Sequence, residues 1–72
     1  MDDISAVVNN YGVVLYVNFA TDRDALSDLL EELGGVRVLP ARDRMRLDYG
    51  NGLTEDSARA VLKRRGVPFD ET

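Results

Sequence analysis

Two apolar stretches near the start of the chain, rich in β-branched residues, predict strands, in which successive side chains point to opposite faces. A turn of hairpin composition, Asn9-Asn10-Tyr11-Gly12, separates them. The second stretch is apolar on both faces, so we expect that strand in the centre of a sheet. Two shorter runs follow later, and the four predicted strands are Ile4–Val8, Val13–Ala20, Val36–Leu39 and Arg44–Tyr49.

Leucines at helical spacing between residues 26 and 33 predict a helix directly after the second strand. Thr21 is expected to cap its N-terminus, with Asp24 as the acid that completes a capping box. Gly34 is expected to end this helix, because glycine readily adopts the left-handed conformation that closes many helices. A second helix is predicted between Thr54 as its cap and Gly66 as its end, with acids in its first turn and bases in its last.

These elements follow the order ββαββα, and residues 1–72 are interpreted as one small α+β domain. The most economical architecture is a four-stranded antiparallel sheet with both helices packed on one face. The expected core consists of apolar residues that share a face at helical or strand period: Leu15, Val17, Phe19, Leu26, Leu29, Leu30, Leu33, Met45, Leu47, Val61 and Leu62.

A weak internal repeat supports this order of elements. The segment from Tyr16 to Asp22 resembles the segment from Tyr49 to Glu55, at an offset of 33 residues. Alanines and leucines of the two predicted helices continue the match. Two explanations stay open: a duplicated ββα unit, and the shared requirements of any strand-to-helix connection.

Charge is sorted by segment, although the net charge of the chain is only −4. Residues 1–35 carry seven acids and one base, whereas residues 36–65 carry eight bases and four acids. Two further acids, Asp70 and Glu71, lie near the C-terminus. This separation indicates either an interaction protein or a fold that neutralises itself internally.

The composition argues against most enzymes. The chain contains no cysteine and no histidine, so it lacks the commonest general base, the commonest metal ligands and any disulfide. We therefore expect no catalytic residue, no metal, no cofactor and no small-molecule ligand. Met1 is followed by two aspartates rather than basic residues, and the longest apolar run is Val13 to Val17. We accordingly expect no secretory signal, no membrane partner and a cytoplasmic location.

The first predicted helix carries four acids without a lysine or arginine four residues further on: Asp24, Asp28, Glu31 and Glu32. Like charges at this spacing destabilise a helix by a few tenths of a kcal/mol. Two interpretations stay open. The acids bind a basic surface of a partner, or they are solvated or paired with the basic half of the chain.

Arg42, Arg44 and Arg46 are expected to project from one face of a strand, beside Tyr16 of the central strand. This face should be open if the helices cover the other one. Arginine and tyrosine are enriched at protein-binding hot spots, and the same pattern suits a nucleic-acid backbone. An ordinary polar sheet face is the third interpretation. The net acidity of the chain argues against nucleic acid.

The function that these features favour is a small, acidic, non-enzymatic protein-binding module. It would inhibit or regulate a larger, nucleic-acid-handling protein by occupying a basic surface of it. Phage-encoded anti-CRISPR and other DNA-mimic proteins work in this way, and the comparison with them is one of size and charge only. Two alternatives are a nucleic-acid-associated regulator that uses the three arginines and a homodimeric structural subunit. The expected partner-binding residues are Asp24, Asp28, Glu31, Glu32, Tyr16, Arg44 and Arg46.

Overall fold

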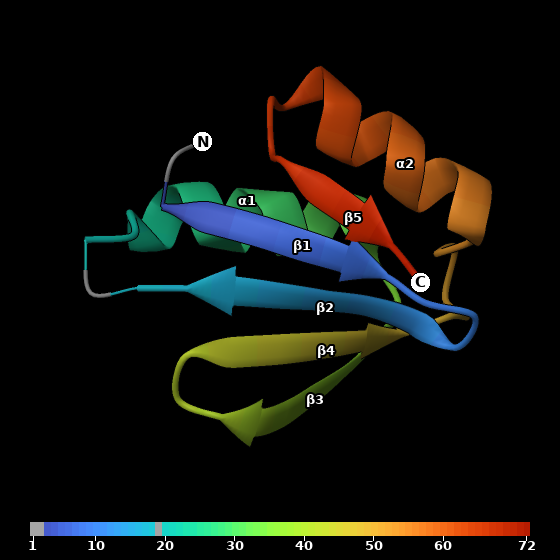
Figure 1. The fold of residues 1–72 in the computed structure, drawn as a ribbon, viewed down its shortest axis with the longest axis horizontal. Coiled ribbons are helices and arrows are strands. Elements are labelled where there is room, and N and C mark those ends of the chain that lie inside the picture. The colour runs from blue at the N-terminus through green and yellow to red at the C-terminus, as the bar shows by residue number, and fades with distance from the viewer. Residues whose placement is uncertain (1–2, 19) are drawn as a thin grey trace.

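The structure is a computed structural model that describes residues 3–18 and 20–72. The described residues form five strands and two helices in the order ββαββαβ (Figure 1). The strands are β1 (Ile4–Val8), β2 (Gly12–Val17), β3 (Val36–Ala41), β4 (Arg44–Asp48) and β5 (Phe69–Glu71), and the helices are α1 (Arg23–Leu33) and α2 (Glu55–Arg64).

The strands form one mixed sheet in the order β3-β4-β2-β1-β5. The first four are antiparallel to their neighbours, whereas β5 runs parallel to β1. The expected four-stranded antiparallel sheet is therefore wrong by one strand. The N–H of Ala6 donates to the Pro68 carbonyl at 3.0 Å, and the N–H of Thr72 donates to the Val8 carbonyl at 3.1 Å. The Phe-Asp-Glu run of β5 lacked a strand pattern because it is short and carries two acids.

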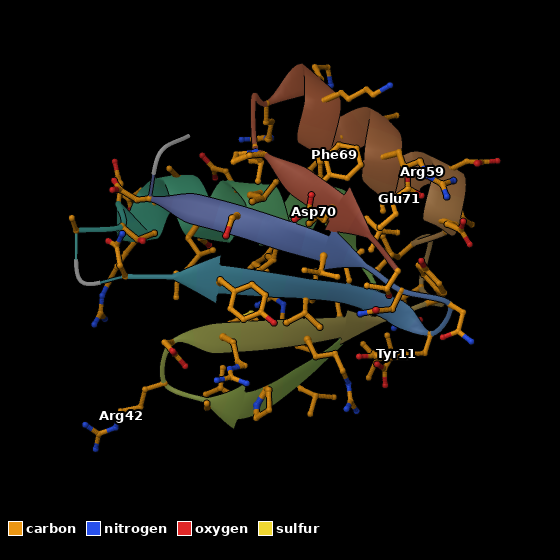
Figure 2. The ribbon with its side chains drawn as sticks, viewed as in Figure 1. Tyr11, Arg42, Arg59, Phe69, Asp70 and Glu71 are labelled. Carbon is orange, nitrogen blue, oxygen red and sulfur yellow. The ribbon has the colours of Figure 1, made fainter. Side chains whose placement is uncertain are left out.

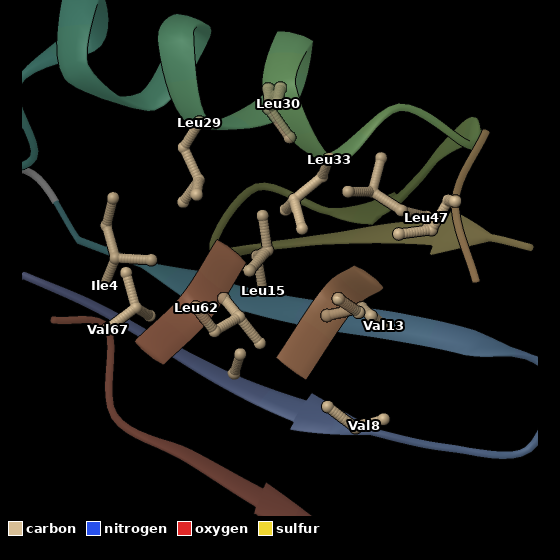
Figure 3. Close-up of a cluster of buried hydrophobic side chains, with 13 residues drawn as sticks. Ile4, Val8, Val13, Leu15, Leu29, Leu30, Leu33, Leu47, Leu62 and Val67 are labelled. Carbon is tan, nitrogen blue, oxygen red and sulfur yellow. The ribbon is translucent and has the colours of Figure 1, made fainter. Parts of the chain in front are cut away.

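One hydrophobic cluster joins the inner face of the sheet to both helices, which confirms the α+β class (Figure 3). Six of the expected core residues are buried: Leu15, Leu29, Leu30, Leu33, Leu47 and Leu62. Val17, Leu26, Met45 and Val61 pack against the cluster while partly exposed. Phe19 lies outside the described residues. The core also contains Ile4, Ala6, Val8, Val13, Leu53, Ala58 and Val67, which the prediction did not include.

Helix α1 begins one residue later than predicted. Its N-cap is Asp22, whose carboxylate accepts from the N–H groups of Asp24 at 2.9 Å and Ala25 at 3.3 Å. The Thr21 hydroxyl instead accepts from the Asn18 N–H at 3.0 Å and closes the turn after β2. The expected capping box of Thr21 and Asp24 is therefore wrong, because a carboxylate nearer to the helix takes the free N–H groups.

Helix α2 is closed at both ends by local hydrogen bonds. Thr54 caps its start as predicted and forms a reciprocal capping box with Ser57. At its end, the N–H of Val67 donates to the Leu62 carbonyl at 2.9 Å, and the N–H of Gly66 donates to the Lys63 carbonyl at 3.1 Å. This pair of bonds turns the chain back toward the sheet, where β5 begins.

Two strand boundaries differ from the prediction by more than one residue. Strand β2 ends at Val17, because the chain turns between Asn18 and Thr21. Strand β3 continues through Pro40 to Ala41, where a turn of two irregular residues leads into β4. Proline is tolerated there because β3 is an edge strand and its ladder with β4 is irregular between Val38 and Ala41.

Candidate interaction surfaces

The sheet has an outer face that is turned away from the buried cluster, and α1 lies behind the sheet in Figure 1. Strand alternation places Val7 of β1 and Val14 of β2 on this face, opposite the buried side chains of the same strands, and the pairing of Val38 with Arg46 places Val38 of β3 there too. Tyr16 is 39% exposed there. The outer face comprises Ser5, Val7, Val14, Tyr16, Val36, Val38, Arg44, Arg46, Asp48 and Asp70.

Two arginines of β4 lie against aromatic rings at this face. The guanidinium of Arg44 lies 5.7 Å from the centre of the Tyr16 ring, and that of Arg46 lies 5.7 Å from the centre of the Tyr11 ring. Arg46 also donates to the Asp48 carboxylate at 2.9 Å. The predicted position of Arg44 beside Tyr16 is confirmed, whereas the ring beside Arg46 is that of Tyr11, which the prediction did not name. Such contacts hold flexible side chains in place, which favours binding because less side-chain freedom is lost.

The predicted position of Arg42 on the strand is wrong. Arg42 lies in the turn between β3 and β4 rather than in the strand, because β4 begins at Arg44. Figure 2 shows its side chain extending away from the sheet at the corner of the molecule. Arg42 therefore does not extend the row that Arg44 and Arg46 form.

A shallow groove of about 380 Å³ opens on the other half of the outer face, beside β5. Its lining combines apolar rings with one exposed carboxylate, that of Asp70. No ion pair between described residues involves this carboxylate. The lining consists of Ser5, Ala6, Val7, Tyr16, Pro68, Phe69 and Asp70.

Helix α1 presents a second surface, which we call the acidic stripe: Asp24, Asp28 and Glu31. All three are exposed, and their spacing of four and three residues aligns them along one side of the helix. Within residues 3–18 and 20–72, no ion pair reaches any of them. The stripe is therefore a solvated, uncompensated row of negative charge.

Glu32, the fourth acid of α1, is placed differently. Its carboxylate accepts from Arg65 at 3.1 Å and is paired with Arg64, so it joins α1 to the end of α2. Its side chain is only 25% exposed. Internal pairing thus occurs for this acid, and its partners belong to α2 rather than to the arginines of the outer face. Sequence spacing could not indicate this contact, because it joins residues 33 positions apart.

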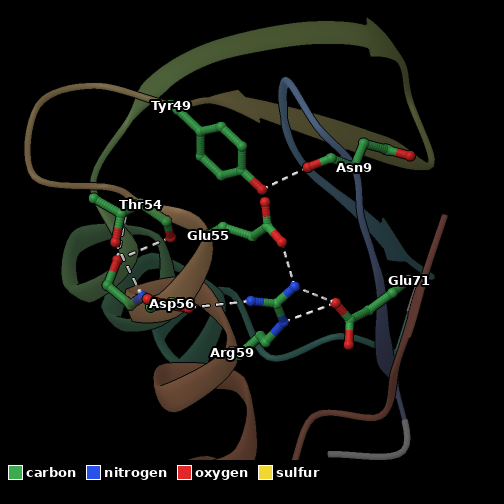
Figure 4. Close-up of polar contacts among 8 residues, drawn as sticks. Asn9, Tyr49, Thr54, Glu55, Asp56, Arg59 and Glu71 are labelled. Carbon is green, nitrogen blue, oxygen red and sulfur yellow. Dashed lines mark hydrogen bonds and ion pairs between the residues drawn. The ribbon is translucent and has the colours of Figure 1, made fainter.

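A cluster around Arg59 ties β5 to α2 (Figure 4). Arg59 donates to Glu71 at 2.7 Å and to Asp56 at 3.2 Å, and it also bonds Glu55. Its hydrogen bond to Arg59 lowers the pKa of the Glu71 carboxyl, and the same bond raises the pKa of Arg59. Nearby, the Tyr49 hydroxyl donates to the Asn9 carbonyl at 2.5 Å, and burial raises the pKa of Tyr49. This cluster was not predicted; the spacing of four residues between Glu55 and Arg59 is its only signal in the sequence.

Comparisons with protein-family models, with curated proteins and with solved structures found no match. In the part of the chain that the structure describes, neither helix is long and apolar enough to cross a membrane. No group of three or more carboxylates among these residues is arranged to hold a metal ion. The two surfaces described above are therefore the features from which a function can be argued.

Proposed function

We propose that this protein is a non-enzymatic protein-binding module whose acidic stripe docks on a basic surface of a larger protein. The observation that carries the proposal is the contrast within α1. Glu32 is paired internally, whereas Asp24, Asp28 and Glu31 are exposed and make no ion pair among the described residues.

The unpaired stripe has an energetic cost that a partner would remove. Like charges at this spacing destabilise a helix by about 0.2–0.5 kcal/mol per pair. Glu31 also lies near the C-terminus of α1, where the helix dipole disfavours a negative charge and no base is present in the last turn. Basic side chains of a partner would offset both terms, so complex formation would stabilise α1.

Electrostatic complementarity of this kind sets the rate and selectivity of association more than its final affinity. A helix of 11 residues is about 16 Å long, so the stripe alone makes a small contact. We therefore expect fast, salt-sensitive binding by the stripe. Inhibition or regulation of the larger protein would follow from occupying a basic surface that its own ligand needs.

Nucleic acid is supported less well as a partner. Arg46 is already bonded to Asp48, Arg44 lies 3.5 Å from the Asp43 carboxylate, and Asp70 shares the same sheet face. These acids would repel phosphate groups. We expect no binding of random duplex DNA at physiological salt.

The test compares two pairs of substitutions that remove the same charge. Asp28→Asn with Glu31→Gln neutralises the stripe, and Asp43→Asn with Asp56→Asn neutralises two exposed acids elsewhere. Immobilised wild-type protein should retain a basic-surfaced protein from the source cells. The stripe variant should lose it, and the control variant should keep it.

Two outcomes with these variants would contradict the proposal. Equal retention by the wild type and the stripe variant would show that α1 does not bind the partner. Fluorescence polarisation would also contradict the proposal if labelled duplex DNA binds the wild type in a salt-dependent way and does not bind the double variant Arg44→Gln with Arg46→Gln. The outer sheet face would then be a nucleic-acid-binding surface. Far-UV circular dichroism confirms that each variant is folded.

A further inference from the structure

We propose that the outer face of the sheet binds the outer face of a second copy of this chain. The two copies are related by a two-fold axis that runs parallel to the strands between β1 and β2. The dimer is then a four-layer sandwich in the order helices, sheet, sheet, helices. This proposal goes beyond the docking of the acidic stripe and does not depend on it.

The sheet register carries the argument. Asp70 pairs with Val7, Val7 with Val14, and Val14 with Arg46, so these four residues form one row across β5, β1, β2 and β4. The middle of this row lies between Val7 and Val14. Asp70 and Arg46 stand at equal distances from it, about 7 Å on either side.

A two-fold rotation about that middle line exchanges the two halves of the row. Arg46 then faces the partner subunit's Asp70, and the same pair forms a second time by symmetry. Val7 faces the partner subunit's Val14, so apolar contacts occupy the centre. Opposite charges flank them on both sides, which is the arrangement of an apolar core and polar rim in protein interfaces.

The neighbouring row supports the same axis. Ser5 pairs with Tyr16, and these two residues are also related by the line between β1 and β2. The rotation places Tyr16 over the partner subunit's Ser5. That small residue lines the groove beside β5, so the exposed ring of one copy meets a hollow in the other. Charge and shape therefore match about the same axis, which favours a second copy over an unrelated protein.

The face is small. Four strands about 4.8 Å apart and about 17 Å long cover roughly 330 Å², which is well below the roughly 800 Å² per partner of a standard stable interface. We therefore expect a reversible dimer that forms at micromolar concentrations. The rotation leaves α1 on the outside of each subunit, because α1 lies on the opposite side of the sheet. A dimer would thus carry two acidic stripes facing away from each other.

The test uses complementary charge reversals in the full chain. Arg46→Glu places two carboxylates opposite each other at both ends of the row, and Asp70→Arg places two guanidinium groups there. Each variant alone should dimerise at least tenfold more weakly than the wild type in sedimentation equilibrium. A mixture of the two variants restores both attractive pairs, so the mixture should form heterodimers. Arg42→Glu and Asp56→Arg are matched controls outside the face, and each should dimerise like the wild type.

Three results would overturn the proposal. The first is a wild type that remains monomeric at high micromolar concentration. The second is a mixture of folded variants that fails to associate. The third is a dimer whose affinity neither charge reversal changes, which would indicate pairing through a strand edge. If Arg46→Glu does not fold, Ser5→Trp replaces it. That substitution fills the groove on an exposed position, and it should weaken the dimer at least tenfold while Asp70→Arg does so independently. Loss of the dimer with retained binding by the stripe separates this proposal from the proposed function.

Discussion

The two ββα halves of the chain use the same local pattern with different outcomes. Leu29 of α1 and Leu62 of α2 are 33 residues apart, and both are fully buried in the same cluster. Matching positions in the strands differ in burial. Tyr16 is exposed on the outer face, whereas Tyr49 packs against the core and bonds Asn9. Matching positions of the repeat therefore have matching environments in the helices and different ones in the strands.

The halves differ most in what their charges do. In α2, Arg59 gathers three carboxylates and fixes the last strand, and the final residues of the helix neutralise Glu32 of α1. In α1, only Glu32 has a partner of this kind among the described residues, and the acidic stripe has none. The charges of the second half thus hold the fold together, while those of the first half are available to another molecule.

The largest expected effect tests what the halves share. Leu29→Ala and Leu62→Ala each leave a cavity in the same core, and each should cost about 2–5 kcal/mol of unfolding free energy. Urea denaturation followed by circular dichroism measures both. Similar losses would confirm that the two helices contribute equally to one core. A melting temperature that Leu29→Ala leaves unchanged would contradict the packing of α1.

A smaller effect is expected where the second half fixes β5. Glu71→Gln weakens the bond to Arg59, so the variant should melt at a lower temperature than the wild type at neutral pH. The Ala6 amide, which bonds Pro68 beside β5, should also exchange hydrogen faster. Asp28→Asn, which removes an exposed acid outside both the Arg59 cluster and the sheet, should leave both measurements close to wild type.

The pH dependence of this effect follows from the pKa of Glu71. Its folded pKa lies below the ordinary value of 4.5, so its stabilising contribution is present above that value and is lost as the pH falls through the folded pKa. The difference in melting temperature between Glu71→Gln and the wild type should therefore shrink as the pH falls below 4.5 and through the folded pKa. An equal difference at every pH would show that charge is not what holds β5.

Short-range patterns predicted most of this fold. Apolar and β-branched runs located four strands, the leucine stripe located α1, and Thr54 and Gly66 bounded α2. Such patterns do not predict contacts between residues that are far apart in the sequence. Strand β5 is held by parallel pairing with β1 and by Arg59, and neither contact appears in a run of three residues. The cap of α1 was displaced by one residue because two adjacent side chains could both cap it.

The candidate surfaces were predictable to different degrees. Exposure of Asp24, Asp28 and Glu31 follows from their place opposite the leucine stripe, so the acidic stripe could be located from periodicity alone. The row from Asp70 to Arg46 could not, because it depends on the register of four strands and on a strand that was not predicted. Glu32 belonged to the predicted set, and only the packing of α1 beside α2 distinguishes it from Glu31.

The smallest expected effect separates these two adjacent acids. Glu32→Gln weakens the pairing with Arg64 and Arg65 and should cost up to about 1 kcal/mol of unfolding free energy, the usual range for partly exposed ion pairs. Glu31→Gln removes an unpaired charge near the helix C-terminus and should be neutral or slightly stabilising. The two variants have the same net charge, so urea denaturation in the same buffer compares the positions directly. High salt should reduce the difference, because it screens both the pair and the dipole. If Glu31→Gln lowers the unfolding free energy as much as Glu32→Gln does, Glu31 is bonded within the fold and does not belong to the acidic stripe.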